Sequence, residues 1–314
     1  MSRRLARMLA AAALAAGGPG GARASGGARG ARALAAAALA ALALGLAAAP
    51  VAGQDSIPAW HVAQSERPSV ATHAYVVAPG VVEVEAGVAA LRPARAAETD
   101  VPLVVKLGLT PRTQLELEWG WTHRHFAPSP APPDVPGEIQ QASANGLVDL
   151  ALALKLRVLE NAPVLANFSV QPSLKLATGS AASGTGTGTT DAGLLLISSR
   201  SLGRFGLDLN AGATWRGGDG AVAPRTATLL TASGGVDLGH GWGFGLELFD
   251  YPGTSGPAGA PPQVGMTIGP TRTVRPWLVF DAGVVANVSG LPANSLYAGV
   301  TWNVGRIRGW PGVR

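Results

Sequence analysis

The chain has 314 residues, of which only 14% are charged and none is Cys. Since an ordinary soluble domain carries about 25% charged residues, this composition argues against a water-facing globular enzyme, and the lack of Cys excludes disulfide scaffolds, Cys-ligated zinc and thiol catalysis. The net charge of +5 is carried by residues 1–53, which hold six Arg and no acid, whereas the remainder has 18 basic and 19 acidic residues. The basic charge therefore gives no reason to expect a nucleic-acid partner.

Residues 1–53 have the layout of a secretory signal peptide. Three arginines precede an uncharged run over residues 33–53, which closes with small residues. We expect this leader to be removed on export, and a permanent membrane anchor of about 20 residues is the alternative. An earlier apolar run near residues 9–16 leaves the true start and the cleavage site open. Residues 54–79 are expected to form a short periplasmic segment, too short for a plug domain.

Residues 80–305 repeat the two-residue rhythm of β-strands. Val82 and Val84 alternate with Glu83 and Glu85, and the same alternation returns to the end of the chain. We expect twelve strands, near residues 81–91, 101–109, 114–122, 146–158, 164–178, 192–199, 205–216, 226–238, 242–249, 263–269, 277–288 and 295–305. Pro172 cannot donate to a hydrogen-bond ladder, so we expect either a bulge or a different register in the fifth strand. Residues 306–314 form a C-terminal tail.

The two faces of these strands differ in chemistry. One face is apolar and includes Val105, Leu107, Phe168, Leu174, Leu230, Val236, Phe244, Leu246, Phe280, Val284, Val300 and Trp302. The other carries the charged strand residues, which are candidates to line a pathway through a barrel: Glu83, Glu85, Lys106, Glu116, Glu118, Asp149, Lys155, Arg157, Lys175, Asp208, Arg216, Asp237, Glu247 and Asp281. Their acidic excess predicts a narrow passage with a slight cation preference, and a lumen closed by ion pairs is the alternative.

Alternation alone does not separate a membrane barrel from a soluble β-sandwich, whose apolar face turns inward. Connection lengths do, because odd-numbered connections are long or moderate and even-numbered ones mostly tight, as in an up-and-down outer-membrane barrel with short periplasmic turns. Aromatic residues gather at strand ends, where interfacial girdles lie: Trp119, Trp121 and Trp215 at the external ends, and Phe205, Trp242, Trp277 and Trp302 at the periplasmic ends. We predict an all-β fold, a transmembrane up-and-down antiparallel β-barrel of about twelve strands, with both termini periplasmic.

Several stretches of the chain resemble one known family. They are Glu66-Arg67-Pro68-Ser69 followed by residues 78–87, then residues 107–117, 146–150 and 174–180. Their order and spacing are similar to those of the outer-membrane transporters grouped as the MetA-pathway-of-phenol-degradation family. The chain departs from that pattern at Ser69, where an acid is usual, and in Gly146-Leu147-Val148-Asp149, where Gly-x-Gly-Asp is usual. The resemblance implies the barrel fold and a broad transport role, and the family name points to aromatic or other hydrophobic compounds.

The last strand, which begins near Tyr297, is similar to the C-terminal signal that barrel-assembly machinery recognises, although Val304 stands where an aromatic residue is usual. His123 and His125 could share a metal ion, but no third ligand of comparable quality lies nearby, so we expect no metal site. No ordered Ser, His and acid pattern is present, and we expect neither an enzyme nor a cofactor.

These observations predict an exported outer-membrane transporter or channel for passive or gated passage of small solutes. We expect contact with outer-membrane lipid, and with the barrel-assembly machinery during biogenesis. Two alternatives remain: a structural or surface-interaction barrel with a filled, non-conducting lumen, and a secreted soluble β-sandwich.

Overall fold

The computed structural model describes residues 60, 62–67, 69–91, 96–126, 143–218, 224–252, 262–290 and 294–311. The expected leader over residues 1–53 lies outside the described residues, as do the first residues of the expected periplasmic segment and most of the longest expected loop. Within the described ranges, no helix is long and apolar enough to cross a membrane.

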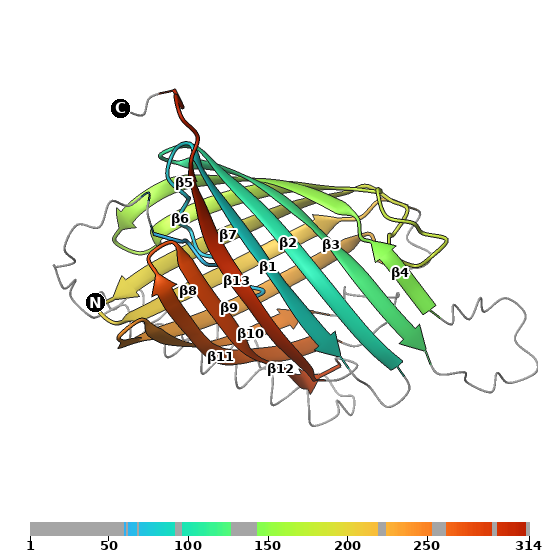
Figure 1. Ribbon diagram of the computed structural model, residues 1–314. Helices are drawn as coiled ribbons and strands as arrows, with labels where there is room; N and C mark the ends of the chain where they lie inside the picture. Colours follow the sequence, from blue (N-terminus) through green and yellow to red (C-terminus); the bar gives the residue numbers. More distant parts are fainter. Residues whose placement is uncertain are drawn as a thin grey trace, which may run out of the picture. The chain divides into compact units, whose positions relative to one another are not determined.

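One antiparallel sheet closes on itself to form a barrel (Figure 1). Its segments in the described chain are β1 (Val81–Leu91), β2 (Ala96–Thr110), β3 (Thr113–Phe126), β4 (Ser143–Leu147), β5 (Leu150–Ala162), β6 (Ala166–Leu176), β7 (Asp191–Leu202), β8 (Phe205–Trp215), β9 (Thr226–Gly239), β10 (Trp242–Tyr251), β11 (Gln263–Arg275), β12 (Leu278–Ser289) and β13 (Ser295–Arg306). β4 and β5 both pair with β3, so they are two parts of one strand. β2 pairs with β1 and β3 and closes a circle of twelve strands, as predicted.

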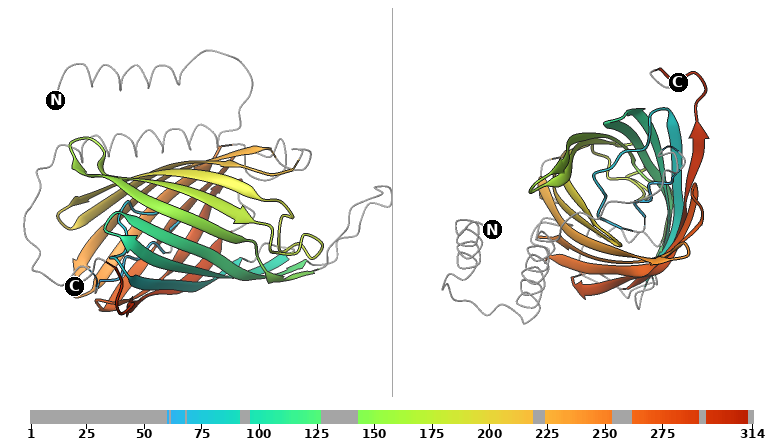
Figure 2. Two further views of the ribbon diagram at one scale, coloured as in Figure 1. Left: turned by 90° about the horizontal axis from the view of Figure 1, so that it is seen from above. Right: turned by 90° about the vertical axis from the view of Figure 1, so that its left-hand side faces the viewer.

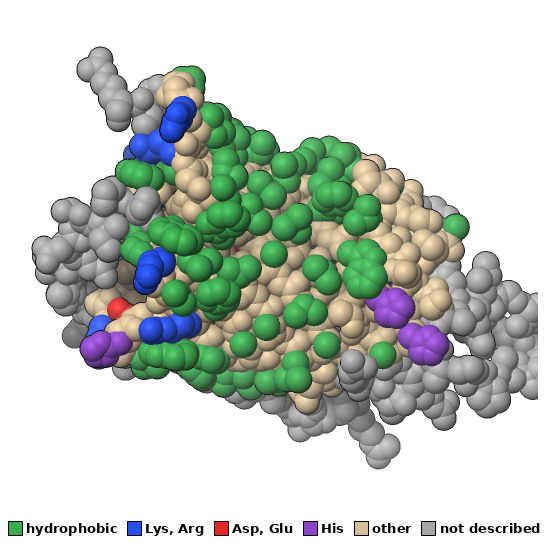
Figure 3. Space-filling model, in the orientation of Figure 1, with side chains coloured by type: hydrophobic (Ala, Val, Ile, Leu, Met, Phe, Trp, Pro, Cys, Tyr) green, Lys and Arg blue, Asp and Glu red, His purple; other side chains and the backbone are tan. Residues whose placement is uncertain are grey.

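The predicted apolar face is confirmed as the outside of the barrel. Leu230, Phe280 and Trp302 are 50%, 46% and 47% exposed, whereas inward-facing Lys106 is 1% exposed. On the side seen in Figure 3, hydrophobic side chains cover the strands, and Lys and Arg side chains gather toward the end that carries the C-terminus. Because this exterior is apolar and the strand charges turn inward, the surface suits lipid rather than water.

The two ends of the barrel differ in their connections. At one end, β2–β3, β5–β6, β7–β8, β9–β10 and β11–β12 are joined by two or three residues; the other end holds connections of up to 16 residues. His240 and Gly241 form one of the tight turns, with positive φ of 54° and 76°, as a type I′ hairpin requires at both positions. β1 starts and β13 ends at this tight-turn end, so the predicted alternation of connections is confirmed.

The expected bulge at Pro172 is wrong. The ladder between β5 and β6 keeps one register from Leu150 to Arg157, and Pro172 pairs with Leu194 of β7 without a shift. The irregularities lie instead between Arg157 and Ala162, next to the β5–β6 turn. Proline lacks one donor, but the sheet around Pro172 continues on both sides and tolerates that single missing hydrogen bond.

Residues 62–67 and 69–80, called the inner segment from here on, run inside the barrel before β1 begins (Figure 2). Ala71, Ala74 and Val77 are at most 4% exposed. The sequence analysis expected a periplasmic segment too short to act as a plug and did not anticipate this position. The inner segment decides how much of the lumen is left open.

Candidate functional site

The backbone of the inner segment is hydrogen-bonded by side chains that point inward from the barrel. The N–H groups of Gln64 and Glu66 donate to Glu83 Oε2 (2.7 Å) and Glu85 Oε1 (2.8 Å) of β1. Further bonds come from β3, β7 and β8: Val77 N–H to Gln114 Oε1 (2.6 Å), Ala74 N–H to Ser199 Oγ (2.7 Å) and Thr72 N–H to Asn210 Oδ1 (2.7 Å). Buried backbone groups must find partners, and the polar interior of the barrel supplies them.

A cluster of charged side chains fixes the inner segment to β1, β2, β3 and β5. Lys106 Nζ lies 2.9 Å from Glu66 Oε2, 3.2 Å from Glu83 Oε1 and 2.7 Å from Glu85 Oε1. Lys155 bonds to Glu66 and lies 3.3 Å from Glu116 Oε1. The charged cluster therefore consists of Glu66, Glu83, Glu85, Lys106, Glu116 and Lys155, in which every acid is within reach of a lysine.

Burial and the neighbouring charges shift the pKa values of two groups in the inner segment. Burial alone would raise the pKa of Glu66, but Lys106 and Lys155 lower that pKa well below its ordinary value. Burial lowers the pKa of His73 to about 4. The carboxylate of Glu66, whose Oε1 lies 3.4 Å from His73 Nδ1, acts in the opposite direction and raises that pKa. At neutral pH the segment thus presents a charged carboxylate and a neutral imidazole.

Two further acids contact the inner segment from other strands. Glu247 of β10 accepts hydrogen bonds from the N–H groups of Val70 (2.9 Å) and Ala71 (2.7 Å). Asp281 of β12 lies 3.9 Å from the guanidinium of Arg67. That guanidinium fills the space over Gly87 and Gly299, where a Cβ would come within 2.2 Å and 2.6 Å of it.

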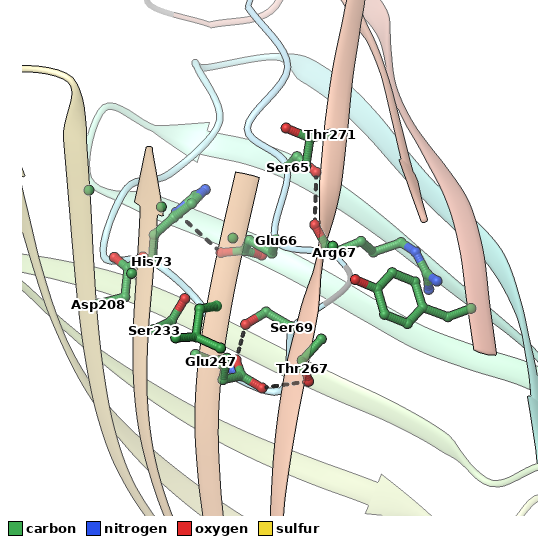
Figure 4. A pocket seen from close by; sticks show the side chains of 18 residues that line it. Ser65, Glu66, Arg67, Ser69, His73, Asp208, Ser233, Glu247, Thr267 and Thr271 are labelled. Carbon is green, nitrogen blue, oxygen red and sulfur yellow. Dashed lines mark hydrogen bonds and ion pairs between the residues drawn. The ribbon is translucent and has the colours of Figure 1, made fainter. Parts of the chain in front are cut away.

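A cavity of about 180 Å³ remains between the inner segment and the wall formed by β8–β11 (Figure 4). Glu66 and His73 face it from the segment, and Asp208, Ser233 and Glu247 face it from the barrel. Asp208 accepts a hydrogen bond from Ser199 Oγ at 2.6 Å. The lumen is therefore packed on one side of the segment and hollow on the other.

A second cavity, of about 350 Å³, lies near the long-loop end and is lined by Glu118, Asp149, Lys175 and Asp191 among others. Lys175 Nζ bridges Asp149 (3.0 Å) and Asp191 (3.1 Å). Asp149 also accepts hydrogen bonds from the N–H groups of Gly179 and Thr187, both in the β6–β7 connection. This group holds that connection against the barrel mouth.

The structure brings together eight of the fourteen predicted pathway residues around the inner segment: Glu83, Glu85, Lys106, Glu116, Lys155, Asp208, Glu247 and Asp281. Glu118, Asp149 and Lys175 meet at the second cavity. The other three lie near strand ends, where Arg157 donates to Pro111 O, Arg216 to Pro224 O, and Asp237 accepts from Gly239 N–H.

Sequence reasoning missed the partners that these residues meet. Glu66, Arg67, Ser69 and Thr72 belong to the inner segment and contact barrel side chains, and His73 of the same segment contacts Glu66. Glu66 and Arg67 belong to a stretch that resembles the family, and their charge outside any strand rhythm was the one available signal. Gln114 and Asn210, which bond to the inner segment, and Gln171, which donates to Glu116 at 2.9 Å, carry no charge and so gave no signal of this kind.

Comparison with known proteins gives a family and a fold. A family model described as "Putative MetA-pathway of phenol degradation" matches residues 65–302. The chain is similar to the COG4313 outer membrane channel from Pseudomonas putida F1, with 12% sequence identity and a TM-score of 0.57, over 73% of this chain and 97% of that one. It is also similar to the KdgM porin, with 11% identity and a TM-score of 0.46, over 70% and 98% of the two chains. No curated protein matches the sequence.

Proposed function

This chain belongs to the family described as "Putative MetA-pathway of phenol degradation", and from that premise we propose that it is an outer-membrane channel for passive or gated passage of small solutes. The fold is that of outer-membrane barrels. One observation carries the proposal: the inner segment fills only part of the lumen and leaves a cavity of about 180 Å³ against β8–β11. A barrel whose interior served only stability would gain by packing that space, because cavities cost free energy.

Hydrophobic or aromatic solutes are the substrate class that we propose, and the inward residues near the long-loop end support it. Phe249 is 5% exposed and shares the inward face with Glu247. Leu195 and Leu229 lie two residues from inward Ile197 and Thr231 and so share their inward face. Apolar side chains in the outer half of the lumen, above the charged cluster, suit a solute that is itself apolar.

The charged cluster favours a second candidate, a structural or surface-interaction barrel that does not conduct. Lys106 and Lys155 are fully buried among carboxylates, and ion pairs of this kind close a lumen as well as they line one. The two candidates differ in one property, which is whether water and ions cross the cavity beside the inner segment.

Conductance in planar bilayers separates the two candidates. The membrane-extracted protein is first run on a denaturing gel with and without boiling, so that only folded barrels with shifted mobility are used. Discrete channel openings are the expected result, with reversal potentials in a salt gradient on the cation-selective side, because Asp208 and Glu247 outnumber Arg67 around the cavity, whereas Glu66 is paired with lysines. Folded barrels that carry no current would contradict the channel and leave the structural barrel.

Export through the N-terminal leader, and insertion by the barrel-assembly machinery, complete the proposal. Both follow from the sequence patterns given above and from the lipid-compatible exterior of the barrel. Separation of inner and outer membranes should place the protein in the outer-membrane fraction, in a form that starts downstream of the leader. Recovery from the soluble fraction would contradict this localisation.

A further inference from the structure

Four glycines stand side by side on the wall of the cavity. Gly206 of β8 pairs directly with Gly235 of β9, Gly235 with Gly245 of β10, and Gly245 with Gly269 of β11. Each lies two residues from a cavity-lining neighbour, in order Asp208, Ser233, Glu247 and Thr267, so each faces the lumen. The strand register thus places a row of four glycines, which have no side chains, across four adjacent strands.

Three of these positions are open. A Cβ built on Gly206 or Gly245 would meet nothing within 4 Å, and one on Gly235 would meet only the carbonyl oxygen of Phe244 at 3.9 Å. At Gly269 a Cβ would lie 2.5 Å from the hydroxyl of Tyr297, so that side chain fills the space there. The glycine groove, defined as Gly206, Gly235 and Gly245, is therefore an unfilled channel in the wall that ends at Tyr297.

Other inward glycines of this barrel have a packing role that the glycine groove lacks. Gly87 and Gly299 accommodate the guanidinium of Arg67, and Gly283 accommodates Tyr297. In those places a side chain would collide with another side chain. At Gly206 and Gly245 a side chain would enter only the cavity, so the absence of side chains there widens the space beside the inner segment.

The row of residues next to the glycine groove is polar and acidic. Asp208 pairs with Ser233, Ser233 with Glu247, and Glu247 with Thr267 across the same four strands. Opposite them, the inner segment contributes Glu66 and Arg67 to the cavity lining. Three carboxylates and one guanidinium therefore surround the space, and a row of carboxylates attracts cations.

We propose that the conducting path past the inner segment runs along the glycine groove, and that Gly206, Gly235 and Gly245 set its width while Asp208 and Glu247 set its charge preference. This inference rests on the proposed channel function. Ions then cross the lumen along the β8–β10 wall and not along the side that holds the charged cluster on β1, β2, β3 and β5.

Single cysteines test the path, because the chain contains no Cys of its own. Gly245→Cys places a thiol in the glycine groove. Val164→Cys is the control, since Val164 lies in the β5–β6 turn, outside the cavity lining, and is 69% exposed, so the reagent reaches it from water. Each folded variant is treated with a methanethiosulfonate reagent bearing a trimethylammonium group during bilayer recording, and labelling is verified by mass.

Labelling of Gly245→Cys should lower the single-channel conductance at least about twofold, because a bulky cation then occupies a narrow pore. Labelling of Val164→Cys should leave the conductance unchanged. If Gly245→Cys fails to fold, Gly206→Cys takes its place. An unchanged conductance after verified labelling in the groove would overturn the path while wild-type current still supported the channel. A wild-type barrel without current would overturn the channel and the path together.

Discussion

The two sides of the lumen differ in their side chains: one binds the inner segment through charged residues, and the other leaves a cavity beside glycines. Around β1, β2, β3 and β5, long charged side chains reach the inner segment and pair with it, Lys106 and Lys155 being the centre of the charged cluster. Along β8, β9 and β10, the glycine groove presents bare backbone to a cavity. Inward charge in a barrel is therefore not by itself a sign of a water path, since the charged cluster holds a segment in place and the cavity beside that segment lies next to the glycines.

This division explains how a segment without secondary structure stays inside a barrel. A buried carboxylate or ammonium group is costly unless it is paired and hydrogen-bonded, and both conditions hold at Glu66, which contacts two lysines and His73. On the hollow side, Glu247 and Asn210 hold the backbone at only a few points.

Removing a lysine from the charged cluster should have the largest effect. Lys106→Met leaves Glu66, Glu83 and Glu85 without their shared cation, and breaking a buried pair in this way costs about 3–5 kcal/mol. We expect a lower unfolding temperature on heat-modifiability gels and a larger, noisier conductance as the inner segment leaves. Arg112→Met is the control, since the Arg112 side chain is 61% exposed. Equal unfolding temperatures for the two variants would show that the cluster does not hold the fold.

Acid should release the inner segment through His73. The pKa of His73 is lowered to about 4 by burial, so the docked state binds fewer protons than a free segment with an ordinary imidazole. Docking is strongest above the ordinary pKa of about 6.5 and weakens as the pH falls toward 4, by at most about 3 kcal/mol over that range. Conductance should rise as the pH falls from 7 to 5, and His73→Gln should flatten this response. A wild-type response retained in His73→Gln would refute the assignment.

Loss of Glu247 should loosen the segment on the hollow side. The Glu247 carboxylate accepts two backbone N–H groups, and hydrogen bonds to a charged group contribute about 1.5–3 kcal/mol each. In Glu247→Ala, amide hydrogen exchange at Val70 and Ala71 should speed up, while exchange at Gln64, held by Glu83, should change little. Uniform acceleration along the whole inner segment would mean that the two sides are not independent.

The smallest effect is expected on ion selectivity. Asp208→Asn keeps the shape of the side chain and removes one carboxylate from the cavity, so the reversal potential in a salt gradient should move toward zero with little change in conductance. Asp237→Asn is the matched control, since Asp237 lies at the β9–β10 turn. If Asp237→Asn shifts the reversal potential as far as Asp208→Asn does, the cavity does not set the preference.

The strands were predictable and the inner segment was not, for a physical reason. Alternation of Val82 and Val84 with Glu83 and Glu85 reflects the local geometry of one strand, and it assigned the two faces correctly. The pairing of Glu66 with Lys106 and Lys155 joins residues 40 and 89 positions apart, and no periodicity in the segment records it. Strand rhythm likewise did not reveal that Val148 and Asp149 interrupt one strand into β4 and β5.

Hydrogen exchange of the folded barrel in detergent tests the central claim most directly. The inner segment is bound inside the lumen through the N–H groups of Gln64, Val70, Ala71, Thr72, Ala74 and Val77. These amides should exchange far more slowly than they do in a free peptide of the same sequence. Exchange at the rate of the free peptide, in a barrel whose strands are protected, would contradict a segment held inside the lumen.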